Sequence, residues 1–91
     1  MKKVVVVDDD DGMRELMSIL LRDRYEVSMA RDGVEGLAVV KAVRPDLLVL
    51  DLLMPRMHGF EVCQRLRADP ELKDTKILIS SSKSYQHDVR T

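Results

Sequence analysis

The segment from Arg44 to Gly59, with the sequence RPDLLVLDLLMPRMHG, constrains the fold more than any other part of the chain. Its first half is a short apolar run, Asp46 to Leu50, which follows a proline and is followed by an acid, Asp51. Proline stops a preceding helix, and a short apolar run bounded in this way predicts a strand that is buried on both faces. Asp51 would then lie at the C-terminal end of that strand, where open α/β sheets place their ligands. Pro55 and Gly59 predict a shaped loop before the next helix.

The rest of the chain alternates between strand patterns and helix patterns. The order β-α-β-α-β-α-β implies a parallel sheet with right-handed crossovers and helices on both faces. The predicted fold class is therefore α/β, with a doubly wound parallel sheet. Strands are predicted at residues 3–7, 25–30, 46–51 and 76–80, and helices from Gly12 onward, at 34–43 and at 60–67. The helix positions expected to face the sheet are Met13, Leu16, Met17, Leu20 and Leu21, then Val34, Leu37, Ala38 and either Val40 or the stem of Lys41, then Phe60, Val62, Cys63 and Leu66.

Acidic and hydroxyl residues follow three of these strands, and the C-terminal ends of parallel strands lie at one edge of a sheet. The acids Asp8 to Asp11 follow the first strand, Asp51 ends the third, and serines at positions 80, 81, 82 and 84 lie at the end of the fourth or just after it. Carboxylates held close together repel each other unless a cation offsets their charge, and Mg²⁺ prefers oxygen ligands. A carboxylate can also act as a nucleophile toward a phosphoryl group, to which a nearby hydroxyl could donate a hydrogen bond. This edge is therefore predicted to be a Mg²⁺ and phosphate site with Asp51 as its working residue.

Composition limits the classes of function and partner. The chain has 91 residues, of which 45% are hydrophobic and 34% charged, as expected for one soluble globular domain. Its net charge of −1 lacks the basic surplus of a nucleic-acid binder, so no direct nucleic-acid contact is expected. The single cysteine, Cys63, cannot form an intrachain disulfide and suits a reducing cytoplasm. No apolar run is long enough to span a bilayer, so no membrane partner is expected.

These residues together resemble the receiver domain of bacterial two-component response regulators, and the resemblance covers essentially the whole chain. It implies a flavodoxin-like fold with strand order 2-1-3-4, followed by a fifth strand that this chain does not contain. An acidic pair combined with a D-x-x-M-P-x-x-x-G segment is a specific signal. The matching stretches are Val6-Val7-Asp8-Asp9, Met13-Arg14, Asp32-Gly33, Pro45-Asp46, Asp51 to Phe60 and Ile77 to Ser81.

The resemblance also implies the roles of individual residues. Asp51 would be the phosphoacceptor. Mg²⁺ would be held by Asp8, Asp9, Asp51 and the backbone carbonyl of Leu53. Ser81 would be the switch hydroxyl, and the phosphodonor would be a sensor histidine kinase or a phosphotransfer protein. The chain would then be a signalling domain that catalyses its own aspartyl phosphorylation, not an enzyme acting on a separate substrate.

Two departures from the family pattern affect these expectations. Ser82 stands where the family usually has alanine, which leaves the choice among Ser80, Ser81 and Ser82 open. The family's fifth strand and fifth helix, on the order of 30 residues at average element lengths, have no counterpart before Thr91. The chain is therefore expected to be a single receiver domain over residues 1–91 that is incomplete at its C-terminus. Its fourth strand would form a sheet edge, which a second chain or a missing segment is expected to cover.

Two other functions remain open from the residues alone. The run from Val4 to Gly12 also resembles the first motif of haloacid-dehalogenase-type phosphatases, in which Asp9 would be the nucleophile and Asp11 the general acid. The chain is short for the later motifs of that fold, and the Asp51 segment would be unexplained. Alternatively, the chain could be a receiver fragment that acts only as a folding or assembly unit. In the receiver interpretation, Asp10 and Asp11 simply cap a helix.

Overall fold

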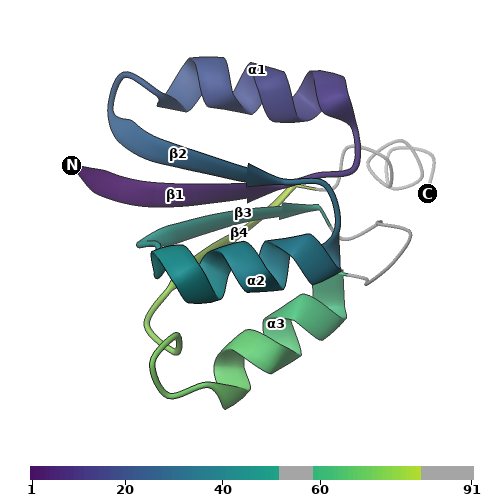
Figure 1. Cartoon of the computed structure of the whole chain (residues 1–91), viewed down its shortest axis with the longest axis vertical. Coiled ribbons are helices and arrows are strands. Elements are labelled where there is room, and N and C mark those ends of the chain that lie inside the picture. Colours follow the sequence, from purple (N-terminus) through teal and green to yellow (C-terminus); the bar gives the residue numbers. More distant parts are fainter. Residues whose placement is uncertain (52–58, 81–91) are drawn as a thin grey trace, which may run out of the picture.

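Four parallel strands form one sheet in the order β2-β1-β3-β4, as predicted. The computed structural model describes residues 1–51 and 59–80, and Figure 1 shows the sheet between two layers of helices. The strand bounds differ from the predicted ones by at most one residue, because the strands coincide with the apolar runs. The strands are β1 (Lys2–Val7), β2 (Tyr25–Ala30), β3 (Leu47–Asp51) and β4 (Lys76–Ser80).

Within residues 1–51 and 59–80, three helices cover the sheet, with α1 on one face and α2 and α3 on the other (Figure 1). The first two begin at aspartates whose carboxylates accept backbone N–H bonds, Asp10 for α1 and Asp32 for α2. Helix α2 ends at Val43, and Arg44 caps it with a left-handed backbone (φ 53°) directly before Pro45. No helix within the described ranges is both long and apolar enough to cross a membrane. The helices are α1 (Asp11–Leu21), α2 (Gly33–Val43) and α3 (Gly59–Ala68).

The two central strands are buried on both faces, which explains their continuous aliphatic sequences. In β1, Val5 and Val7 belong to the core beneath α2 and α3, whereas Val4 and Val6 belong to the core beneath α1. The backbone register pairs Val7 with Leu50 of β3, so β1 and β3 end side by side. This register places the residues that follow Val7 and Leu50 next to each other at the C-terminal edge of the sheet.

Several helix positions predicted to face the sheet are exposed instead. In α1, Leu16 is exposed and Leu20 is 65% exposed. The reason is that α1 packs over β2 and β1, and no second helix accompanies it on that face among residues 1–51 and 59–80. In the other two helices only a narrow stripe meets the sheet. The buried members of that stripe are Leu37 and Val40 in α2 and Val62 and Leu66 in α3, whereas Val34, Ala38 and Phe60 are exposed.

Gly36 lets α2 approach β1 closely. A Cβ atom at this position would lie 2.8 Å and 2.9 Å from the two methyl carbons of buried Val7. We therefore expect Gly36→Ala to lower the free energy of unfolding by roughly 1–3 kcal/mol, despite the better helix propensity of alanine. Urea denaturation measures this cost, and in a Val7→Ala background the cost should shrink or change sign. An equal loss of unfolding free energy in both backgrounds would show that the close approach of α2 to Val7 is not the cause of the destabilisation.

Candidate functional site

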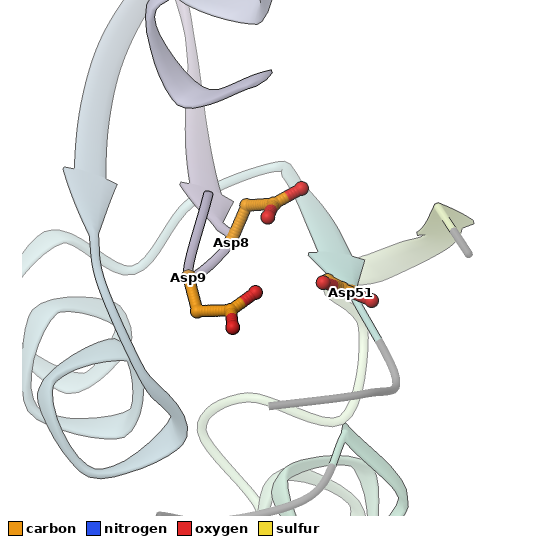
Figure 2. A group of neighbouring side chains, drawn as sticks. All are labelled: Asp8, Asp9 and Asp51. Atoms are coloured by element: carbon orange, nitrogen blue, oxygen red, sulfur yellow. The ribbon is translucent and has the colours of Figure 1, made fainter. Parts of the chain in front are cut away.

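Three carboxylates gather where β1 and β3 end. Asp8 and Asp9 directly follow β1, and Asp51 is the last residue of β3. Figure 2 shows their side chains around one space at the C-terminal edge of the sheet. One carboxylate oxygen of each residue lies within 4.8 Å of the corresponding oxygens of the other two. The predicted grouping is therefore present for Asp8, Asp9 and Asp51, whereas the serines from Ser81 onward lie outside the described residues.

Burial makes the charges in this group unusually costly. The exposed fractions are 1% for Asp51 and 4% for Asp8, and Asp9 is half-buried. Water screens such charges poorly, and like charges at this separation repel. A divalent cation would offset that repulsion, and a donor set made only of carboxylate oxygens suits the hard cations Mg²⁺ and Ca²⁺. The chemistry of the three residues therefore fits a divalent cation.

Main-chain hydrogen bonds hold the segment that carries Asp8 and Asp9. The backbone N–H of Asp8 donates to the carbonyl oxygen of Ala30 in β2 at 3.2 Å. The backbone N–H of Asp10 donates to Oδ1 of Asp8 at 2.9 Å, which fixes the direction of the Asp8 carboxylate. The backbone of Asp8 is thus bonded to β2, and the Asp8 side chain is bonded to the backbone two residues later.

The next two acids serve the start of α1. Oδ1 of Asp10 accepts hydrogen bonds from the backbone N–H groups of Gly12 at 2.9 Å and Met13 at 3.3 Å. Asp11 opens the helix, its side chain is 88% exposed, and it forms an ion pair with Arg14. The prediction that these two acids serve a helix start is confirmed: Asp10 caps α1, and Asp11 lies in its first turn. The phosphatase alternative, which needs Asp11 beside Asp9 as a general acid, gains no support from this placement.

Arg14 is a contributor to the site that sequence reasoning did not assign. Its side chain is only 13% exposed, and its Nη1 donates to the backbone carbonyl oxygen of Asp8 at 2.7 Å. Its Nη2 pairs with Asp11. The sequence offered two signals, the place of Arg14 in the matching Met13-Arg14 stretch and its position one helical turn after Asp11. The second predicts the ion pair, but neither predicts the bond to Asp8.

Two predicted site residues, Leu53 and Ser81, lie outside the described residues, so their roles stay predictions. Ser80, the neighbour of Ser81, pairs with Asp51 in the register between β4 and β3. Cys63 belongs to α3 and packs against the core, as predicted. Burial raises the pKa of its thiol, and the nearby charge of Arg67 only partly opposes this. Cys63 therefore stays a thiol near neutral pH and is not a nucleophile of the site.

Comparisons with known proteins agree with this geometry. A family model, the response regulator receiver domain, matches residues 4–91. The DNA-binding dual master transcriptional regulator RpaA of Synechocystis is 41% identical over 80 residues, which cover 87% of this chain and 33% of that protein. The structure of Vibrio cholerae chemotaxis protein CheY4 is similar with a TM-score of 0.83 at 37% identity, covering 99% of this chain and 79% of that one. The phosphorylated cyanobacterial phytochrome response regulator RcpA has a TM-score of 0.83 at 31% identity, with coverages of 98% and 71%.

The family match extends over both the Asp8–Asp9 segment and the Asp51 segment. The sheet order and the structural neighbours establish the doubly wound, flavodoxin-like fold. The chain spans about a third of the length of the curated relatives that it matches. The chain belongs to the family of response regulator receiver domains, the signalling domains of two-component systems.

Proposed function

We propose that this chain is a phosphoacceptor domain that takes a phosphoryl group onto Asp51 with the help of Mg²⁺. The observation that carries the proposal is the placement of buried Asp51 at the end of β3, with oxygens of Asp8 and Asp9 within 4.8 Å. Such an acid is poised at the sheet edge where parallel α/β folds place ligands. Asp8, Asp9 and Asp51 would hold the cation, together with the backbone carbonyl of Leu53.

The proposed reaction is a transfer between two side chains. A carboxylate oxygen of Asp51 forms the new O–P bond while the P–N bond of a phosphohistidine donor breaks. The electron pair of that bond leaves with the imidazole, which takes up a proton from solvent. Bound Mg²⁺ would offset the negative charge shared by the carboxylates and the phosphoryl oxygens. Ser81 would donate a hydrogen bond to a phosphoryl oxygen once the transfer is complete.

The proposed partner is a sensor histidine kinase or a phosphotransfer protein in the cytoplasm. The single cysteine of the chain fits that reducing compartment. RcpA, a structural neighbour, is described in its phosphorylated form. RpaA is described as DNA-binding, and most of its length lies beyond the part that this chain matches. Any DNA-binding output would accordingly belong to another part of a longer regulator.

A second proposed contact covers the edge of the sheet at β4. This strand pairs only with β3 among the described strands, and its residues Leu78 and Ile79 are exposed. An apolar edge with unpaired backbone groups tends to pair with another segment. We expect the 91-residue chain either to self-associate or to gain stability from an added strand. Sedimentation equilibrium measures the self-association. A stable monomer across the micromolar range would count against the proposed self-association.

The phosphoacceptor proposal is tested by incubating the chain with Mg²⁺ and a small acyl phosphate, followed by intact-mass measurement. We expect a gain of one phosphoryl group that requires Mg²⁺ and is lost on treatment with hydroxylamine, because acyl phosphates are labile to that nucleophile. Borohydride reduction and peptide mapping then identify the modified aspartate. Modification of Asp51 supports the proposal, whereas modification of Asp9 would support the phosphatase-type chemistry and overturn it.

A further inference from the structure

Arg14 joins the end of β1 to the start of α1. Its Nη1 contacts the Asp8 carbonyl oxygen at 2.7 Å, and its Nη2 pairs with Asp11 in the first turn of α1. One planar guanidinium thus bridges a backbone oxygen of Asp8, one of the three acids drawn in Figure 2, and a side chain in the first turn of α1. Arginine suits this task because its donors are arranged in a rigid fork.

The bond from Arg14 to the Asp8 carbonyl oxygen affects the carboxylate site because of where that oxygen lies in the backbone. The Asp8 carbonyl belongs to the planar peptide unit that links Asp8 to Asp9. Fixing that oxygen fixes the orientation of the peptide plane, and with it the directions in which both side chains leave the backbone. The bond from Asp10 N–H to Oδ1 of Asp8 then sets the rotation of the Asp8 carboxylate itself. The Asp8 carboxylate is thereby aligned before any ligand arrives, and the peptide unit that precedes the Asp9 side chain is held in place.

We propose that Arg14 is a positioning residue that makes the carboxylate site of Asp8, Asp9 and Asp51 selective for Mg²⁺ over Ca²⁺. The inference rests on the cation site of the proposed function. Mg²⁺ demands near-ideal octahedral geometry with short bonds, whereas Ca²⁺ accepts variable geometry and longer bonds. A group of carboxylates that loses its alignment therefore loses Mg²⁺ affinity first.

The positive charge of Arg14, taken alone, would weaken metal binding, whereas its positioning of the ligands would strengthen it. The electrostatic and the positioning role can therefore be separated by experiment. A cation beside the site repels a metal ion, so a purely electrostatic Arg14 would weaken the binding of Mg²⁺ and Ca²⁺ alike. Its removal would then strengthen both, and added salt would reduce the change. A positioning Arg14 instead strengthens Mg²⁺ binding, and its removal weakens Mg²⁺ more than Ca²⁺ in a manner that salt changes little.

Isothermal titration of the folded chain with Mg²⁺ alone and with Ca²⁺ alone provides the test, at two salt concentrations. We expect Arg14→Ala to weaken Mg²⁺ binding by about 10-fold or more, the usual size of an effect from a residue that orients metal ligands. Ca²⁺ binding should fall by less than roughly 3-fold, because its geometry is permissive. Arg14→Lys, which keeps the charge and one donor to the carbonyl, should recover part of the loss.

Asp11→Ala is the matched control, because it removes the ion pair but leaves the bond from Arg14 to the Asp8 carbonyl. It should leave the ratio of Mg²⁺ to Ca²⁺ affinities near that of the wild type. Equal loss of both ions in Arg14→Ala, stronger binding, or no change would overturn the inference. If Arg14→Ala does not fold, the ratio of Mg²⁺ to Ca²⁺ affinities is compared between Arg14→Lys and Asp11→Ala instead. A ratio that is not lower in Arg14→Lys would overturn the inference. Failure of the wild type to bind either ion would instead overturn the proposed cation site, and the inference with it.

Discussion

Asparagine at position 51 is expected to abolish phosphoryl uptake completely. Asp51→Asn keeps the size of the side chain but replaces the attacking carboxylate oxygen with an amide, which is a poor nucleophile. Because Asp51 is 1% exposed at the end of a central strand, an isosteric change should leave the fold in place. Intact mass after incubation with Mg²⁺ and the acyl phosphate should show no added phosphoryl group.

Asp46→Asn is the control for this substitution. Asp46 lies just before β3, at the opposite end of the same strand, where its Oδ2 accepts the backbone N–H of Lys3 at 2.9 Å. Asparagine can accept the same bond, so this variant should gain a phosphoryl group as the wild type does. Uptake by Asp51→Asn at the wild-type level would show that another residue is the acceptor and would rule out the proposed role of Asp51.

Mg²⁺ is expected to stabilise the wild-type chain strongly. A ligand that binds only the folded state at 100 times its dissociation constant adds about 2.7 kcal/mol to the free energy of unfolding. Asp9→Asn should remove most of this gain, because it deletes one of three negatively charged ligands. In the absence of metal the same variant should be at least as stable as the wild type, because one source of repulsion is gone. Urea denaturation with and without Mg²⁺ measures both differences.

Asp23→Asn provides the matched comparison for Asp9→Asn. Asp23 is exposed and precedes β2, at the N-terminal edge of the sheet and away from the three carboxylates. Asp23→Asn removes one negative charge, as Asp9→Asn does, so any general effect of net charge on stability should appear in both variants. Equal stabilisation by Mg²⁺ in Asp9→Asn and the wild type would mean that the cation binds elsewhere. Loss of the Mg²⁺ effect in Asp23→Asn would lead to the same conclusion.

The sequence alone was sufficient to predict the order and class of the elements. Buried parallel strands must be apolar on both faces, so Val4 to Val7 and Leu47 to Leu50 are recognisable without any knowledge of their neighbours. Helix starts are equally local, because an aspartate such as Asp10 caps the backbone a few residues ahead. Once the strands are known to be parallel, topology alone brings Asp8, Asp9 and Asp51 to one edge of the sheet.

Tertiary structure decided which side chains are covered and which groups meet. The exposure of Leu16 and Leu20 depends on how much of the sheet α1 spans, and helical periodicity does not contain that information. The contact between Gly36 and Val7 depends on the distance between α2 and β1. The bond from Arg14 to the Asp8 carbonyl joins groups six residues apart across a change from strand to helix. Local patterns specify elements because side-chain periodicity and helix capping act over only a few residues. These contacts depend instead on how the finished elements pack in space.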